Sequence, residues 1–238
     1  FQNTYNFVEK SSITSNTEIV ESKVIFNVHW IVDIQTKEGE TVSEIIDHLA
    51  ESPIKLKKVH DTARKIIERE LIEFKLEDLT QDLIALDHDD VPVAGFEMRC
   101  NEKKWKKTDV EQGLKNLLRI NLPQIKVEGT NYVDFPEELS YYQSHYVWNI
   151  DDDYLQPQVS TLFSFQDNFP FSFNVHPSSG NTLSSNPIVG NNPLLSFLCM
   201  QSWKFVYDVF YPVQVDVIDE TTGYRFKMAF TVHLKNNA

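Results

Sequence analysis

Two acidic runs hold the densest sets of metal-binding side chains in this sequence. Asp87-His88-Asp89-Asp90 is one, and Asp151-Asp152-Asp153 is the other. Hard cations such as Ca²⁺ take several oxygen ligands from one loop. Neither run has the Asp-x-Asp-x-Asp-Gly order of a calcium-binding loop. We therefore interpret both runs as solvated acidic turns and expect no metal and no cofactor.

Catalysis by a thiol nucleophile requires a cysteine beside a histidine, and Cys199 with His176 is the pair that this chain would have to use. Nothing in the sequence places these two side chains together. The seven histidines are dispersed without a His-x-x-x-His or His-Glu-x-x-His pair, and no Gly-x-Ser-x-Gly motif occurs. We expect that the protein is not an enzyme.

The chain has two cysteines, Cys100 and Cys199, and their spacing fits neither a zinc site nor a Cys-x-x-Cys redox pair. Two interpretations stay open. The cysteines are either inert buried thiols or a single long-range disulfide, and a disulfide would require an oxidising compartment.

An aromatic cluster is the best candidate for binding. Aromatic rings can stack on sugar rings or anchor a protein partner, although such residues more often fill the core of a sheet. The candidate binding aromatics are Tyr141, Tyr142, Tyr146, Trp148 and Tyr154.

Composition limits the classes of partner. Lys and Arg number 22 against 35 Asp and Glu, which gives a net charge of -13. This charge argues against nucleic acid, because phosphate binding needs a cationic face, and against adsorption to anionic lipid. No apolar run approaches the roughly 20 residues that span a bilayer. The chain opens on Phe1 and not on methionine, so we expect a piece of a longer protein.

The first third of the chain combines one strand with helices. Residues 24–34 alternate between apolar and polar side chains, which predicts an antiparallel strand with one buried face. Thr41 with Glu44 forms a capping box, which predicts a helix to about Glu51. Further helices are expected at residues 56–74 and 76–86.

The remainder is mainly strand, apart from a helix expected at residues 108–119 behind a second capping box. Residues 177–193 are rich in turn-forming side chains and predict one long, mobile loop. Phe205 to Val217 and Phe226 to Leu234 alternate on either side of a turn, which predicts a long hairpin. Further strands are expected at residues 93–99, 125–127, 145–150, 158–165 and 171–175.

These elements predict an α+β fold, in which an antiparallel sheet carries helices on one face and ends in the C-terminal hairpin. We expect residues 1–238 to form a single module. Residues 18–92 would supply a strand and helices, and residues 93–238 would be mainly β.

Several segments between Val93 and Asn237 together resemble an uncharacterised family of archaeal proteins that is best represented in small-genome lineages. The segments are Phe96-Glu97-Met98-Arg99-Cys100 followed by Trp105, Asn121-Leu122-Pro123, Tyr146-Val147-Trp148, Leu195-Ser196-Phe197-Leu198-Cys199, and Phe205-Val206-Tyr207-Asp208-Val209 with Tyr211-Pro212-Val213.

Members of that family look like surface proteins with an amino-terminal membrane anchor. The resemblance therefore implies an extracellular, cell-surface location and a chain that continues beyond Ala238. It also favours a disulfide between Cys100 and Cys199, because both positions fall in matching segments. It supplies no catalytic residue. This sequence has no anchor of its own, so any membrane attachment would run through a segment outside it.

We expect a non-catalytic structural or adhesive module that binds protein partners or itself. One alternative is a subunit of a surface filament, in which the polar segment Phe1–Thr17 pairs with the sheet edge of a neighbour. A second alternative is a glycan-binding module or hydrolase, which would need a deep pocket with converging carboxylates.

Overall fold

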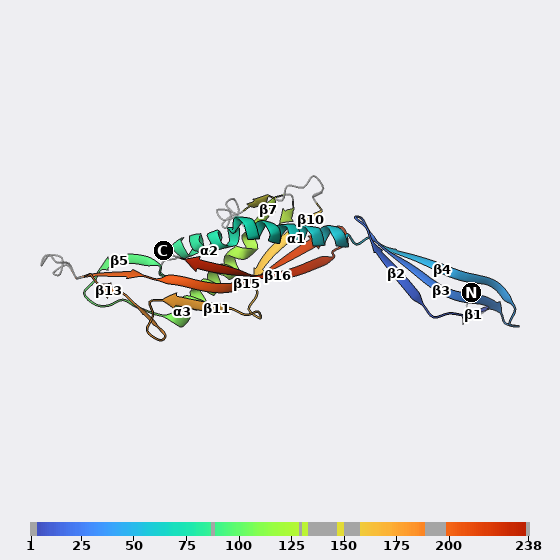
Figure 1. Ribbon diagram of the computed structural model, residues 1–238, viewed down its shortest axis with the longest axis horizontal. Coiled ribbons are helices and arrows are strands. Elements are labelled where there is room, and N and C mark those ends of the chain that lie inside the picture. The colour runs from blue at the N-terminus through green and yellow to red at the C-terminus, as the bar shows by residue number, and fades with distance from the viewer. Residues whose placement is uncertain are drawn as a thin grey trace. The chain divides into compact units, whose positions relative to one another are not determined.

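The computed structural model of this chain describes residues 4–86, 89–128, 130–132, 147–149, 158–188 and 199–236 (Figure 1). The chain divides into two compact units. Unit 1 comprises Phe1–Thr62 with Ile218–Phe226, and unit 2 comprises Ala63–Val217 with Lys227–Ala238. The described elements are mostly antiparallel strands with three α-helices, which confirms the α+β class.

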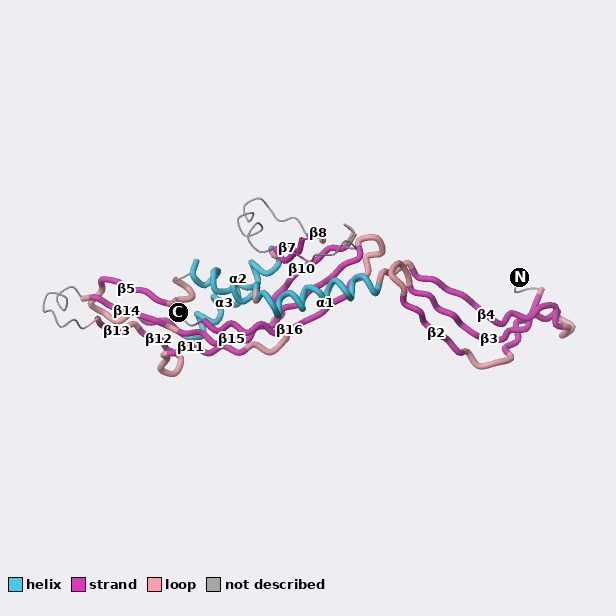
Figure 2. The backbone as a smooth tube through the Cα atoms, turned by 45° about the horizontal axis from the view of Figure 1, so that its top comes forward, coloured by secondary structure: helices cyan, strands magenta, loops and turns pink. Residues whose placement is uncertain are grey.

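Unit 1 contains a sheet built around one long central strand, β3 (Val24–Thr36). The strand β4 (Thr41–Ser52) pairs with β3 from Val24 to Gln35 and so occupies one edge of it. The other edge is shared by β1 (Tyr5–Glu9) and β2 (Thr14–Ile19), which pair with the two halves of β3. All three pairings are antiparallel. Figure 2 shows β2, β3 and β4 running side by side.

The helix expected from Thr41 to Glu51 is wrong, since these residues form strand β4. Gly39, at a φ of 91°, adopts the left-handed backbone that a tight turn needs, and its amide donates to Thr36 O at 3.0 Å. This turn returns the chain along the open edge of β3. Val42, Ile45 and Ile46 are β-branched and favour a strand over a helix. Tertiary pairing therefore overrides the local capping signal.

The predicted strand at residues 24–34 is confirmed, but the expected burial of its apolar face fails over most of its length. Among the described apolar side chains of this sheet, Val24 and Val32 are buried, whereas Phe26 is 37% exposed. An alternating sequence shows that the two faces of a strand differ in polarity. It does not show whether another part of the structure covers the apolar face.

Three α-helices accompany the main sheet of unit 2. They are α1 (Leu56–Glu73), which begins in unit 1, α2 (Lys75–Leu86) and α3 (Lys107–Asn121). Their apolar residues recur at helical spacing, and the three predicted helices here are confirmed to within two residues. α3 is followed by a short 3₁₀ turn at Leu122–Gln124.

The main sheet is centred on β15 (Val206–Asp219), which pairs with β11 (Ser172–His176), β10 (Val159–Phe165) and β16 (Arg225–Asn236), while β8 (Asn131–Tyr132) pairs with β10. The Tyr211 hydroxyl lies 2.9 Å from Leu76 O and 2.7 Å from Thr80 Oγ1, so α2 packs against β15. The alternating apolar side chains of β15 fill this core, with Tyr207 and Tyr211 fully buried.

A smaller sheet follows in the order β13 (Asn186–Pro187), β14 (Met200–Lys204) and β5 (Ala94–Met98). Two further pairs join β12 (Thr182–Ser184) to β6 (Lys104–Lys106), and β7 (Lys126–Glu128) to β9 (Val147–Asn149).

The single long loop expected at residues 177–193 is wrong for its described part, because β12 and β13 lie within it. Leu183 is fully buried opposite Trp105 of β6. A single apolar side chain in a polar segment produces no alternating pattern, so these short strands could not be predicted from the sequence. Residues 189–193 lie outside the described residues.

Candidate functional site

Cys100 and Cys199 form a disulfide, with their Cα atoms 4.4 Å apart. Cys100 follows β5 and Cys199 precedes β14, and these strands place Met98 opposite Met200. The Arg99 amide donates to Cys199 O at 2.6 Å, which extends the pairing to the disulfide itself. Strand pairing therefore positions both cysteines, and the pairing that the family resemblance implied is present. The bond also leaves no free Cys199 thiol to act as a nucleophile with His176.

The strands that carry the disulfide are fixed by close packing of an aromatic ring on a glycine. A Cβ at Gly95 would lie 2.5 Å from Trp203 Cζ2, so the indole lies directly over this backbone. Trp203 also contacts Trp105, with ring centroids 5.3 Å apart, and Lys103 Nζ lies within 5.2 Å of both ring centroids. This cluster ties β14 to β6 and supports a structural role for the region.

Four of the five candidate binding aromatics lie outside the described residues. These are Tyr141, Tyr142, Tyr146 and Tyr154, whereas Trp148 is described only as a backbone position in β9. Of the acidic runs, Asp89 and Asp90 are exposed, and the rest lies outside the described residues. In the part of the chain that the structure describes, no group of three or more His, Cys, Asp or Glu side chains is arranged to hold a metal ion.

Glu70 is a buried acid in unit 2. It is 6% exposed near the end of α1, and its two carboxylate oxygens accept the Leu76 amide at 3.1 and 3.2 Å. Burial raises the pKa of Glu70 to about 7, against the lowering effect of the amides of Leu76 and Lys75. Its oxygens cap the first turn of α2, so its role is structural.

Two hollows have apolar or mixed linings. One of about 440 Å³ lies between α1 and β16 and is lined by Leu71, Phe74 and Phe230 among others. Another of about 490 Å³ lies on the sheet of unit 1, where His29 Nδ1 is 2.9 Å from Asp47 Oδ1. Both partners of that pair are largely exposed, with side-chain fractions of 54% and 83%. The first hollow is also lined by the carboxylates of Glu70 and Glu77. Both are held by backbone amides, since Glu70 accepts from Leu76 and Glu77 accepts from Lys235 at 3.3 Å.

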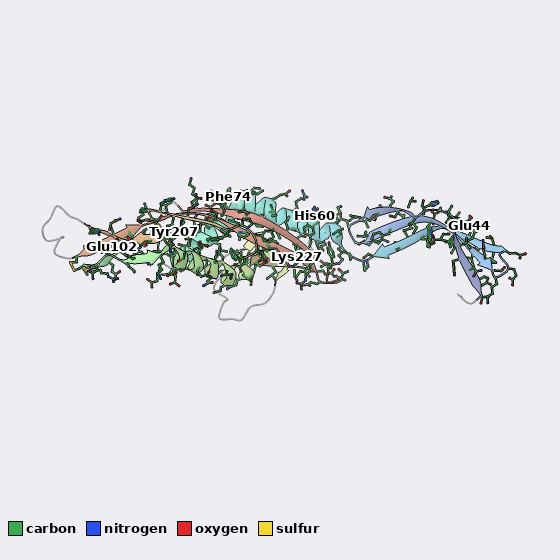
Figure 3. All side chains as sticks on the ribbon, turned by 90° about the horizontal axis from the view of Figure 1, so that it is seen from below. Glu44, His60, Phe74, Glu102, Tyr207 and Lys227 are labelled. Carbon is green, nitrogen blue, oxygen red and sulfur yellow. A yellow bond between two sulfur atoms is a disulfide. The ribbon has the colours of Figure 1, made fainter. Side chains whose placement is uncertain are left out.

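The sheet of unit 1 carries many exposed apolar side chains. Figure 3 shows side chains standing out along its strands, Glu44 of β4 among them. Many of the exposed side chains are large and apolar, including Phe7 at 54%, Leu49 at 65% and Val42 at 57%. The further exposed apolar side chains of residues 4–52 are Ile13, Ile19, Phe26, Ile45 and Ile46. A four-stranded sheet of this kind normally buries such residues under a second layer.

The exposed surface of this sheet also includes the edge of β4 that faces away from β3. Thr41 to Asp47 is exposed without a break, and β3 is the partner of β4 within the described sheet. Sequence reasoning missed this edge because the capping pattern assigned β4 to a helix. The signal that could have found it is the density of β-branched residues, Thr41, Val42, Ile45 and Ile46, immediately after a glycine turn.

Among the residues that the structure describes, no helix has both the length and the apolar character needed to cross a membrane. No protein-family model, no curated protein and no solved structure matches this chain.

Proposed function

We propose that this chain is a non-catalytic structural module of an extracellular cell-surface protein, and that the sheet of unit 1 joins it to other copies of itself. The observation that carries the proposal is the exposure of that sheet, on which large apolar side chains meet solvent beside an edge of β4 that no other described strand pairs with.

The free energy of such a sheet favours a partner. Sheets of this size need packing against another layer to be stable, and clustered exposed apolar side chains mark interaction surfaces. Each square ångström of apolar surface removed from water contributes roughly 25 cal/mol. Covering exposed side chains of β4 such as Ile45 and Ile46 would therefore stabilise the sheet as well as join two molecules.

The location is supported by the disulfide, because such bonds persist in oxidising compartments. The resemblance to archaeal anchored surface proteins supports the same location, and we propose membership of that family. Attachment to a membrane would run through an anchor outside residues 1–238. We propose that units 1 and 2 act together as one module.

The finer architecture is part of the proposal. We expect the helices of unit 2 to form a layer on one face of its sheet, and β15 and β16 to form a C-terminal hairpin. The contacts of Tyr211 with α2 support the layer. The pairing of β16 with β15 supports the hairpin, and so does the turn in which the Asp219 amide donates to Tyr224 O at 2.9 Å.

In a filament, a segment other than Phe1–Thr17 would have to pair with the neighbouring molecule. The segment expected to reach a neighbour, Phe1–Thr17, supplies Tyr5–Glu9 and part of β2 to the sheet of its own chain. Assembly by strand pairing would therefore use an edge of the completed sheet. A polymer and a closed dimer are both structural assemblies, and the mass of the assembled species distinguishes them.

Sedimentation velocity of the oxidised chain over roughly a hundredfold range of concentration tests the proposal. We expect a reversible shift from monomer to a larger species. Ile46→Lys, in the sheet of unit 1, should weaken the shift, whereas Leu71→Lys, at a more exposed residue of α1 in unit 2, should not. A monomer at every concentration, or equal effects of the two variants, would contradict the proposal.

A further inference from the structure

We propose that β4 pairs antiparallel with β4 of a second copy about a twofold axis at Ile46, so that two sheets of unit 1 become one continuous sheet. This inference rests on the proposed function, because it names the partner and the surface of that same association.

The first support is the length and openness of the edge. β4 spans twelve residues, against five in β1 and six in β2 on the opposite edge. Ten of its twelve residues are exposed, the exceptions being His48 and Ser52. An open edge of this length presents a row of backbone amides and carbonyls that another strand can satisfy.

The second support is the lack of lysine and proline along this edge. Natural edge strands often carry lysine or proline to prevent pairing between molecules. β4 contains neither, and its bulge lies at Val42, so the regular part of the edge begins at Ser43. A strand from another protein could also pair with this edge. We commit to a second copy because the side chains of β4 are compatible with those of an antiparallel β4.

That fit fixes the register. Residues directly opposite each other lie on the same face of a sheet, and a twofold axis normal to the sheet relates identical faces. Neighbouring residues point to opposite faces. The axis must therefore pass midway between one residue and the same residue of the second copy. The middle of Thr41–Ser52 offers Ile46 or Asp47. An axis at Asp47 would set two carboxylates against each other, and like charges directly opposite are destabilising.

An axis at Ile46 avoids every such conflict. It places Ile46 opposite its copy, Glu44 opposite His48 and Ser43 opposite Leu49. β4 has a bulge at Val42, because Ser43 pairs with Ile34 of β3 and Thr41 pairs with the next residue, Gln35. The regular pairing therefore runs from Ser43 to Leu49, and the exposed apolar residue at its centre, Ile46, meets an identical side chain. Heterologous contacts build open filaments, whereas this isologous contact closes as a dimer.

The acidic charge predicts how the contact responds to salt. The pairing brings Glu44, Asp47 and Glu51 of two strongly acidic chains near one another. Repulsion between exposed charges is screened by salt, with a Debye length of about 10 Å at 0.1 M ionic strength. Raising the ionic strength should therefore strengthen the association.

Cysteine cross-linking on the full chain tests the geometry. Both native cysteines are consumed by the disulfide, so Ile46→Cys adds a single free thiol. At the proposed axis the two Cα atoms would be about 4.5–5.5 Å apart, within the range that a disulfide spans. Leu49→Cys and Val42→Cys are the controls, since three and four residues from the axis separate their copies by about 20 and 27 Å.

We expect the Ile46→Cys chain to form a covalent dimer under mild oxidation at least about tenfold faster than either control. Both controls replace more exposed side chains, so random collisions would give the opposite order. Equal rates, or faster cross-linking of a control, would overturn the proposal. If wild-type chain associates but Ile46→Cys does not cross-link, the register fails and the structural function stands. If wild-type chain does not associate, both fail.

Discussion

Glu70 binds the backbone amide of Leu76 with both carboxylate oxygens, at 3.1 and 3.2 Å, and so links α1 to the first turn of α2. The same carboxyl is 6% exposed, and burial raises its pKa from 4.5 to about 7. The joint between these helices therefore contains a group that changes charge near neutral pH.

Stability should consequently depend on pH. Between pH 4.5 and about 7 the folded chain keeps a proton on Glu70 that the unfolded chain releases. The free energy of unfolding should fall as pH rises through this window, by up to about 3 kcal/mol. Denaturant midpoints between pH 4 and 8 measure the slope. Glu70→Gln should flatten it, and Glu68→Gln, on the exposed side of α1, should not. An unchanged slope in Glu70→Gln would contradict this account.

The disulfide should be a large stabilising contribution. It closes a loop over a sequence separation of 99, and the chain-entropy model gives a loop of this size up to about 4.7 kcal/mol. Cys100→Ser with Cys199→Ser should lower the free energy of unfolding by about 2–4 kcal/mol in guanidinium titrations. Intact mass after alkylation under denaturing conditions checks the bond itself. Two blocked thiols before reduction would show that it is absent.

The packing of Trp203 on Gly95 predicts a sharp contrast between two glycines. Gly95→Ala would push a methyl group into the indole and should cost about 1–3 kcal/mol. Gly113→Ala, inside α3, meets its nearest atom at 3.4 Å and should stabilise the helix by about 0.5–1 kcal/mol. Thermal unfolding of both variants measures the difference. Equal stability of the two would show that the indole does not cover Gly95.

Much of unit 2 could be predicted from sequence because its signals are redundant. In α1, α2 and α3 the helical period of apolar residues agrees with later burial, and in β15 alternation agrees with a two-sided core. The disulfide could not be predicted from such patterns. Composition left Cys100 and Cys199 undecided, and the expectation of a bond came from resemblance.

Unit 1 could not be predicted in the same way, because pairing determined its structure. Thr41 and Glu44 give a helical capping pattern whose contribution is local and small, whereas β3 offers a full strand edge. β1 is only five residues long and β2 is polar apart from Ile19, so neither carries a strong strand signal, and they are strands because β3 pairs with them. The candidate surface was missed for the same reason, since its position depends on β4 being a strand.

The central claim is that β4 is the edge through which two copies join. Hydrogen–deuterium exchange of the intact chain at low and high concentration tests it most directly, because pairing would slow exchange of the amides that now face solvent. The account predicts slower exchange in peptides covering Thr41–Ser52 at high concentration, further slowing with added salt, and no change in peptides covering β2. Exchange that is independent of concentration in β4, or protection that appears at β2 instead, would contradict it.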